Sequence, residues 1–179
     1  MNKVFSVWKP VNISSFDVIR KIKSYNKSLR IGHCGTLDPF AEGVLIICIG
    51  SFTKKVEQYM SQSKRYVASI VFGKETDTLD LTGRLIKSTN PLKNIKLTDI
   101  ESIISNFIGT TPQVPPYFSA KKINNIKMYE FARNDIFIRV KPVDVHIPNI
   151  KILDFCNNIL TLDIECSKGT YIRSLARDI

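Results

Sequence analysis

The chain has 179 residues, of which 44% are hydrophobic, so it is long enough to bury a core and does not need disulfides to fold. Lysine and arginine number 26 against 16 acidic residues, and the net charge of +10 favours a polyanionic partner such as nucleic acid, although abundant solvating lysine would give the same charge. The longest purely apolar run, Val44–Ile49, is too short to span a membrane. The opening residues MNKVFSVWKP have no long apolar stretch and no small-residue cleavage site, and the four cysteines lack the CxxC spacing of zinc ligands. We therefore expect a reduced, soluble, cytoplasmic protein with no membrane association and no metal.

The first predicted elements are a strand and a helix. Val4–Trp8 has the apolar character of a short strand, which Pro10 ends. The sequence S-S-F-D, from Ser14 to Asp17, resembles a capping box. Apolar residues at helical spacing follow it, so we predict a helix over Ser15–Tyr25.

The middle of the chain alternates between loops and strands. Two glycines and a proline predict a loop over Arg30–Gly43, and the buried strand Val44–Ile49 follows it. A short helix is predicted over Thr53–Met60 and a strand over Lys64–Phe72. The acidic stretch Glu75–Gly83 is typical of a polar turn.

The second half begins with another predicted helix. Thr98 and Glu101 have the spacing of a capping box, and Gly109 is expected to stop the helix. Thr110–Ala120 contains three prolines and is predicted to be an extended loop. A short helix over Met128–Arg133 follows.

Strands return before a last helix. Val143–Ile147 and Leu160–Cys166 alternate apolar residues with other residues, as half-exposed antiparallel strands do. Gly169–Ile179 is predicted to turn helical, and we interpret the end of the chain within this helix as a truncation. The mixed order of elements predicts an α+β sheet domain and not a doubly wound one.

A carboxylate in the segment Gly32–Leu45, GHCGTLDPFAEGVL, is the first candidate for chemistry. Asp38 lies between a glycine-rich turn and Pro39, just before a buried strand, so its backbone is restricted while another molecule can approach closely. A rigidly held nucleophile would have this pattern. An Asx-turn, in which the carboxylate binds local N–H groups, would have it as well, and the local pattern leaves both interpretations open.

Three further segments have the composition of binding surfaces. In Lys64-Arg65-Tyr66 two cations precede a ring that could stack on a base, although a core tyrosine at a strand end is the more common case. Ser167–Arg173 is a glycine turn before a helix and could hold an anion, or be an ordinary strand-to-helix turn. Aromatic and basic residues interleave in Pro115–Lys122 and Lys127–Arg133, as on RNA-binding surfaces, or the aromatic residues could be core anchors.

Taken together and in this order, these segments resemble the TruB family of tRNA pseudouridine synthases. Gly32–Leu45 is similar to that family's catalytic motif GHxGTLDPxAxGVL. The other segments that match family motifs are Trp8-Lys9-Pro10, Lys64-Arg65-Tyr66, Thr76-Asp77-Thr78, Pro115–Lys122 and Ser167–Arg173. Cys34 stands where the family often has threonine or another small residue, and Asn124-Asn125 stands where glycine is common.

The resemblance implies roles for six residues. Asp38 corresponds to the nucleophile, and Arg173 to an arginine that pairs with it. Tyr66 corresponds to a tyrosine that stacks on the target base and is implicated in proton removal, and Tyr171 to another active-site residue. His33 corresponds to a histidine that helps to hold the RNA with the base flipped out. Lys9 corresponds to a lysine that the family carries early in its sequence, near the active site.

The resemblance also implies the architecture. We expect a mixed, mostly antiparallel sheet of pseudouridine-synthase type flanked by helices. Residues 1–179 would form the catalytic domain, C-terminally incomplete, with a thumb-like RNA-binding insertion over residues 110–135 and without the RNA-binding domain of PUA type that family members often carry.

The implied function is isomerisation of uridine to pseudouridine at position 55 in the T arm of tRNA. Nothing is oxidised in this reaction, so no cofactor is expected, and we expect a monomer whose partner is tRNA. The alternative is a truncated, non-catalytic module that binds and folds tRNA. A weaker third interpretation is a phosphate-binding protein that uses Gly169–Arg173.

Overall fold

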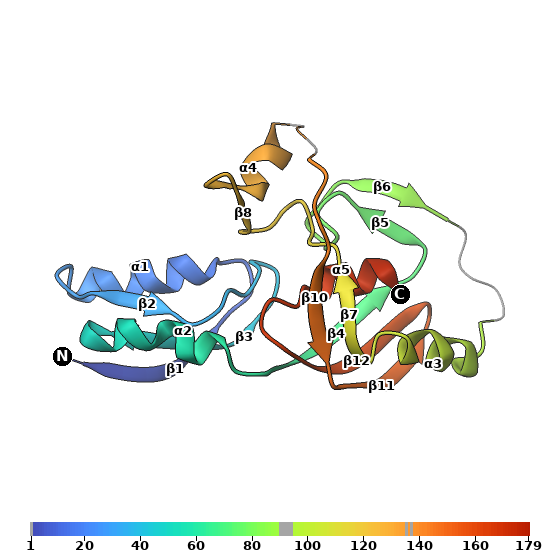
Figure 1. Ribbon diagram of the computed structural model, residues 1–179, viewed down its shortest axis with the longest axis horizontal. Helices are drawn as coiled ribbons and strands as arrows, with labels where there is room; N and C mark the ends of the chain where they lie inside the picture. The colour runs from blue at the N-terminus through green and yellow to red at the C-terminus, as the bar shows by residue number, and fades with distance from the viewer. Residues whose placement is uncertain (1, 90–94, 135, 137) are drawn as a thin grey trace. The chain divides into compact units, whose positions relative to one another are not determined.

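The computed structural model describes residues 2–89, 95–134, 136 and 138–179 (Figure 1). The chain divides into two compact units, Met1–Gln62 and Ser63–Ile179. Strand pairing is antiparallel throughout the described residues, and helices accompany the sheets in both units. The predicted α+β class is therefore confirmed.

The first unit is built on a three-stranded sheet with strand order β1-β3-β2. Its elements are β1 (Lys3–Lys9), α1 (Ser15–Tyr25), β2 (Ile31–His33), β3 (Gly43–Ile49), the 3₁₀ helix η1 (Gly50–Lys55) and α2 (Val56–Met60). The central strand β3 pairs with β1 on one side and with β2 on the other. The loop between β2 and β3, which carries Asp38, therefore connects two neighbouring strands of the sheet.

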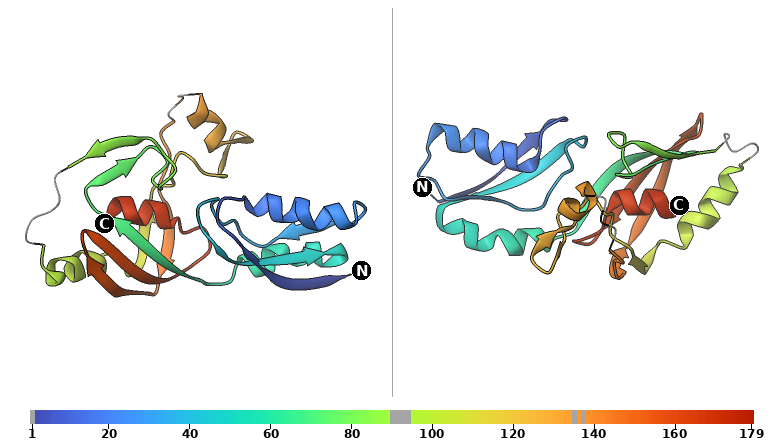
Figure 2. Two further views of the ribbon diagram at one scale, coloured as in Figure 1. Left: turned by 180° about the vertical axis from the view of Figure 1, so that it is seen from behind. Right: turned by 90° about the horizontal axis from the view of Figure 1, so that it is seen from above.

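Helices lie on both faces of this sheet, as the view from above in Figure 2 shows. On one face Val18 and Ile19 of α1 pack against the buried side chains of β3. On the other face a methyl group of Val56 in α2 lies 3.2 Å from where a side chain on Gly32 would begin. The strand β3 is therefore covered on both faces over its second half, as its continuous apolar sequence predicts, whereas Val44 near its start is 63% exposed.

The helix α1 has the predicted bounds, and its N-terminus explains why. The backbone N–H of Asp17 donates to the hydroxyl of Ser14, and the Ser14 N–H donates to the carboxylate of Asp17 at 2.9 Å. This reciprocal pair is the predicted capping box. Hydrogen bonds from Ser14 and the nearby Arg20 guanidinium lower the pKa of Asp17.

The second unit contains a three-stranded sheet with strand order β11-β12-β4 and three two-stranded pairs: β10-β7, β5-β6 and β8-β9. Its strands are β4 (Lys64–Val71), β5 (Lys74–Thr76), β6 (Leu85–Ser88), β7 (Gly109–Gln113), β8 (Lys122–Ile123), β9 (Ile126–Lys127), β10 (Val143–Ile147), β11 (Asn149–Cys156) and β12 (Ile159–Cys166). Its helices are α3 (Leu97–Ser105), α4 (Met128–Arg133) and α5 (Ile172–Asp178).

The core of the second unit lies against β12. Leu160, Leu162 and Ile164 of this strand are fully buried, and Ile104 of α3 and Leu175 of α5 join them. Alternate residues of a strand point to one face, so β12 presents three apolar side chains to the helices. The helix predicted within Gly169–Ile179 is thus present as α5 and packs against this core.

Three local expectations were wrong. The segment predicted as a loop over Arg30–Gly43 contains β2, and that over Thr110–Ala120 contains most of β7. In β7, Pro112 lies opposite Asp144 of β10, and an edge strand tolerates a residue that lacks an N–H donor. The helix α3 begins at Leu97, where the carboxylate of Asp99 accepts the backbone N–H of Lys96, and not at the predicted Thr98 cap.

In the part of the chain that the structure describes, no helix is both long enough and apolar enough to cross a bilayer.

Candidate functional site

The loop that carries Asp38 turns back on itself directly after this residue. The backbone N–H of Ala41 donates to the carbonyl of Asp38 at 3.1 Å, which closes a turn with Pro39 at its second position. Proline favours this position because its fixed backbone angle suits the turn. The backbone N–H of Asn12 donates to the carbonyl of Pro39 at 2.7 Å, so a second loop of the first unit holds the turn.

A buried serine fixes the residue before Asp38. Ser15, the first residue of α1, is 2% exposed. Its hydroxyl donates to the carbonyl of Leu37 at 3.1 Å and accepts the Leu37 N–H at 3.0 Å. Both polar backbone groups of Leu37 are therefore bound by one side chain, and the capped helix α1 supports that side chain in turn.

Lys9 holds the other side of the turn. It is the last residue of β1 and is fully buried. Its ammonium group donates to the carbonyls of Pro10 and Ile13, both at 2.8 Å, and of Pro39 at 3.4 Å. Burial lowers the pKa of Lys9, and the negative charges of Asp38 and Glu42 partly oppose this effect. In this position Lys9 stabilises the loop, and contact with a substrate stays a prediction.

His33 is the last residue of β2 and lies half-buried at the start of the loop. Its Nδ1 is 2.5 Å from the carbonyl oxygen of Gly35. Because a carbonyl only accepts, Nδ1 is the donor in this contact.

Tyr66 lies on β4 in the second unit, where it pairs with Ile164 of β12. It is half-buried and packs against the core of that unit with its neighbours on the same face, Ala68 and Ile70. The side chain of Arg65 points to the opposite face because successive residues of a strand alternate.

An ion pair stabilises this register. The guanidinium of Arg65 donates to both carboxylate oxygens of Asp163 on β12, at 2.7 Å and 2.5 Å. These hydrogen bonds lower the pKa of Asp163 and raise that of Arg65. The pair spans neighbouring strands in a bidentate geometry, so it opposes any slip of β4 along β12.

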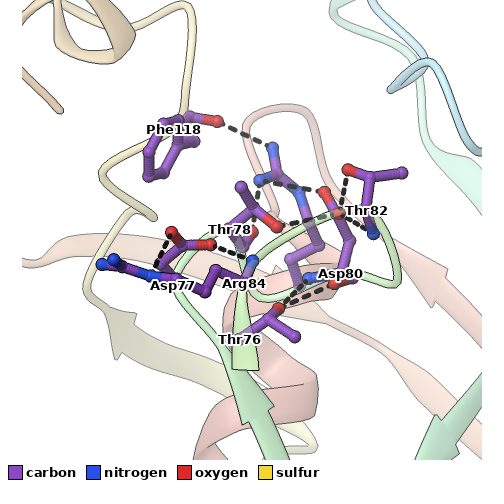
Figure 3. A network of polar contacts seen from close by, with 8 residues as sticks. Thr76, Asp77, Thr78, Asp80, Thr82, Arg84 and Phe118 are labelled. Carbon is purple, nitrogen blue, oxygen red and sulfur yellow. Dashed lines mark hydrogen bonds and ion pairs between the residues drawn. The ribbon is translucent and has the colours of Figure 1, made fainter. Parts of the chain in front are cut away.

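Arg173 joins three segments of the second unit. Its partners Thr78, Asp80 and Phe118 are labelled in Figure 3. Its guanidinium donates to the carbonyl of Thr78 at 2.8 Å and to that of Phe118 at 3.0 Å. It also forms an ion pair with Asp80 at 3.7 Å. The motif segments Thr76-Asp77-Thr78, Pro115–Lys122 and Ser167–Arg173 therefore meet at one arginine.

The carboxylate of Asp80 also organises its own loop. One of its oxygens accepts the Thr78 hydroxyl and both the hydroxyl and the N–H of Thr82, at 2.6 to 2.9 Å. The hydroxyl of Thr76 binds the backbone N–H and carbonyl of Asp80 at 3.0 and 2.7 Å. At Gly83 an added side chain would come within 2.2 Å of the Thr78 hydroxyl, so glycine is required there.

Tyr171 is held through its backbone. Gln113 of β7 is buried, and its side-chain amide accepts the Tyr171 N–H at 2.8 Å and donates to the Tyr171 carbonyl at 3.1 Å. Tyr171 and Gln113 line a hollow of about 200 Å³ together with Lys121, Val145, Gly169 and two further residues. The hollow lies entirely within the second unit.

The expected insertion, residues 110–135, begins in β7 and continues into a hairpin and a helix; residue 135 lies outside the described residues. Asn124 and Asn125 connect β8 to β9 with backbone φ angles of 51° and 66°. Such angles suit a two-residue hairpin turn, which asparagine tolerates. The cations of Lys127 and Arg133 lie over the ring of Tyr129, at 5.3 and 5.2 Å from its centre.

The six candidate residues thus fall into two groups. Lys9, His33 and Asp38 belong to the first unit, and Tyr66, Tyr171 and Arg173 to the second. The expected pairing of Arg173 with Asp38 stays a prediction. Within the described residues, no three His, Cys, Asp or Glu side chains converge as metal ligands would.

Sequence reasoning missed three residues that hold the candidates in place. They are Ser15, Asp80 and Gln113. Asp80 follows the Thr76-Asp77-Thr78 motif closely, and this proximity was a usable signal. Ser15 had only the neighbouring capping box as a signal, and Gln113 had none.

Comparison with protein families gives a match over most of the chain. The model described as TruB family pseudouridylate synthase (N terminal domain) matches residues 20–172. A protein named tRNA pseudouridine synthase B from Clostridium acetobutylicum is 44% identical over 179 residues, which is 100% of this chain and 61% of that protein. Its namesake from Borreliella burgdorferi strain ZS7 is 43% identical over 93% of this chain and 59% of its own length. The chain thus spans about three fifths of these relatives.

Solved structures share the fold. A chain in "Crystal Structure of a Cbf5-Nop10-Gar1 Complex" superposes with a TM-score of 0.69 at 23% identity, over 97% of this chain and 42% of that chain. A chain in "Structure of H/ACA RNP bound to a substrate RNA containing 2'-deoxyuridine" gives a TM-score of 0.64 at 21% identity, over 97% and 40%. At these identities the likeness concerns the fold alone.

Proposed function

The chain belongs to the TruB family of pseudouridylate synthases, and on this premise we propose that it isomerises the T-arm uridine at position 55 of tRNA to pseudouridine, with Asp38 as the nucleophile. Relatives named tRNA pseudouridine synthase B, which match 93 to 100% of this chain, support the proposal. We assign residues 1–179 to the catalytic domain of such an enzyme. We further propose that it acts as a monomer in the cytoplasm.

The reaction explains why a carboxylate is needed. The bond from C1′ of the ribose to N1 of uracil breaks, the base rotates, and a bond from C1′ to C5 forms. The carboxylate of Asp38 adds to the sugar or to the base and leaves again, so it is unchanged at the end. The proton on C5 is lost and N1 gains one, which makes the reaction a redox-neutral isomerisation.

The observation that carries this proposal is the way in which the Asp38 loop is held. Ser15 binds both backbone groups of Leu37, and Lys9 binds the carbonyl of Pro39, so the residues on either side of Asp38 are tied to the sheet and helix of the first unit. A nucleophile must stay within a fraction of an ångström of its reactive position. Anchors on both sides support this role for Asp38.

In this proposal Tyr66, Tyr171 and Arg173 serve the flipped-out base and the nucleophile. An extruded uridine loses the stacking of its neighbours, and the ring of Tyr66 replaces that stacking. Tyr66 also takes part in removing the C5 proton. Arg173 pairs with Asp38 and orients the carboxylate that acts as the nucleophile. Tyr171 is a further residue of the proposed active site.

We assign recognition of the RNA fold to His33 and to the insertion over residues 110–135. His33 helps to hold the RNA with the base out. The insertion carries cations beside an aromatic ring, as in Lys127 and Arg133 around Tyr129. Such surfaces suit RNA because rings stack on bases and cations bind the phosphates. The net charge of +10 supports the same assignment.

Release of the C5 proton gives a direct test. A T-arm stem-loop made with tritium at C5 of its uridines loses tritium to water only when pseudouridine forms. The Asp38→Asn protein is expected to bind the stem-loop with unchanged affinity and to release no tritium above background. Full activity in this variant would show that Asp38 is not the nucleophile.

A matched exchange controls for the loss of charge. Asp154 is exposed on β11, and Asp154→Asn makes the same chemical change. It is expected to leave tritium release unchanged. If the unaltered chain binds the stem-loop tightly and in a salt-dependent way but releases no tritium, the non-catalytic tRNA-binding module is the better description.

A further inference from the structure

Two buried thiols lie in contact beneath the Asp38 loop. The sulfur atoms of Cys34 and Cys48 are 3.4 Å apart, and neither cysteine is in a disulfide. Cys48 is fully buried in the central strand β3, and Cys34 is 7% exposed. Cys34 lies one residue beyond the end of β2 and four residues before Asp38.

The sheet register places both thiols on one face. Gly32 of β2 is the partner of Cys48, and Cys34 follows two residues later, so its side chain points to the same side as the Gly32 position. This face is the one that Val56 of α2 covers. The two sulfur atoms therefore meet in a closed layer between sheet and helix.

We propose that Cys34 and Cys48 form an oxidative modification site, in which a peroxide closes a disulfide that displaces the Asp38 loop. Cys34, the more exposed thiol, attacks a peroxide oxygen as its thiolate. The O–O bond breaks, and Cys34 becomes a sulfenic acid while hydroxide leaves. The thiolate of Cys48 then attacks this sulfur, the S–O bond breaks and a second hydroxide leaves. The two thiol protons convert the hydroxides to water, so two thiols and hydrogen peroxide give a disulfide and two waters.

The geometry determines which part of the molecule moves. A disulfide requires the sulfur atoms to approach to about 2.05 Å and the Cα atoms to about 6 Å, whereas diagonal neighbours on antiparallel strands have Cα atoms about 7–8 Å apart. Cys48 is fixed because β3 pairs with a strand on each side. Cys34 follows the last residue of β2, and its backbone is tied to β3 by a hydrogen bond, from its N–H to the carbonyl of Ile46 at 2.8 Å. It precedes Gly35, whose φ of 104° allows the chain to pivot. The adjustment therefore falls on Cys34 and the loop.

Movement of this loop acts on Asp38 through Leu37. The two hydrogen bonds between Ser15 and Leu37 hold the loop in its reduced position. A shift of about 1 Å at a catalytic group reduces a rate by about 100-fold. The disulfide should therefore lower activity reversibly; this consequence, unlike the bond itself, rests on the proposed function.

The chain offers a simple test of the bond. No lysine or arginine lies between Arg30 and Lys54, so trypsin releases both cysteines in one peptide, residues 31–54. Protein carrying Cys156→Ser, which removes the exposed thiol, is treated with hydrogen peroxide and digested. The peptide is expected to lose the mass of two hydrogen atoms. After further cleavage at Glu42, its halves should stay joined until dithiothreitol is added. Oxidation of the exposed Cys156 in the unaltered protein serves as the control that the peroxide is active. If this control succeeds and the halves of the peptide separate without reductant, the proposal is overturned.

Two measurements test the displacement of the Asp38 loop separately from formation of the disulfide. Amide hydrogen exchange across residues 34–41 is expected to accelerate at least tenfold in the disulfide form and to recover on reduction; unchanged exchange in a protein shown to be linked would overturn the displacement. Cys34→Ser, which keeps the size of the side chain, is expected to show no peroxide response in either measurement. Neither readout needs activity, so an inactive but responsive protein would contradict only the proposed function.

Discussion

The guanidinium of Arg173 and the carboxylate of Asp80 form an ion pair at 3.7 Å in which both side chains are more than nine tenths buried. Arg173 also donates to the carbonyls of Thr78 and Phe118, and Asp80 accepts hydrogen bonds from its own loop. Two opposite charges are thus placed in the interior with hydrogen bonds around each. Removing one member of such a pair costs more than the pair itself contributes, because the remaining charge stays desolvated.

Asp80→Ala is expected to lower the free energy of unfolding by about 3 kcal/mol, because the buried guanidinium of Arg173 loses the opposite charge of Asp80. Asp80→Asn should cost less, about 1 kcal/mol, since its amide oxygen can still accept the Thr82 N–H. Urea unfolding followed by circular dichroism measures both. An alanine variant as stable as the unaltered protein would mean that Arg173 does not depend on this carboxylate.

Ser15→Ala removes the hydroxyl that binds both backbone groups of Leu37. The buried N–H and carbonyl lose their partner, so the variant should be about 1–3 kcal/mol less stable, and tritium release from the T-arm stem-loop should fall about tenfold as the loop loosens. Ser24→Ala, an exchange at an exposed position of the same helix, should change neither quantity. Equal behaviour of the two variants would contradict an anchoring role for Ser15.

The Arg65–Asp163 pair predicts a specific response to acid. The pKa of Asp163 in the folded protein lies below its ordinary value of 3.8, so the folded state binds fewer protons than the unfolded state between the two values. The stability contributed by the pair is fully present above pH 3.8 and is lost as the pH falls through the lowered pKa. Asp163→Asn should therefore be less stable than the unaltered protein at pH 7, and this difference should shrink in strong acid. A difference that stays constant down to pH 2 would exclude this linkage.

The hairpin of the insertion depends on two asparagines with positive φ. Asn125→Val places a β-branched residue in that conformation at a cost of about 1–2 kcal/mol, which should open the hairpin. The expected result is a weaker affinity for the T-arm stem-loop with an unchanged unfolding midpoint of the rest of the chain. Asn125→Gly tolerates the same φ and should bind as the unaltered protein does. Equal affinities of the valine and glycine variants would show that the hairpin shape does not contribute to binding.

Local sequence signals predicted much of the fold. The helix over Ser15–Tyr25 has its predicted bounds because the capping box and the apolar spacing lie within the helix itself. The helix over Met128–Arg133 was also correct. In contrast β2 and β7 are short strands, and each exists because a partner lies elsewhere in the chain. For β7 that partner, β10, is some thirty residues away in the sequence, so no local pattern revealed the strand.

The candidate site shows the same division. Motifs identified Asp38, Tyr66 and Arg173 because their neighbours in sequence are distinctive. The residues that position the motifs act over long separations: Ser15 binds Leu37, 22 residues away, and Gln113 binds Tyr171, 58 residues away. A common residue type such as serine or glutamine has no local signature for a contact of this kind. These residues became visible only with the structure.

The register of β4 on β12 limits how this protein can change in length. Tyr66 of β4 lies opposite Ile164 of β12. Inserting one residue into β4 ahead of Tyr66 would turn the Tyr66 side chain to the face that Arg65 now occupies. Inserting two residues would restore the face but move the ring about 7 Å along the sheet. Insertions and deletions should therefore not be tolerated within β4 and β12, nor in the two-residue Asn157–Asn158 turn, whose length and positive φ angles set the register of β11 on β12. The spacing of residues along β4 is as much a requirement of the proposed site as their identity.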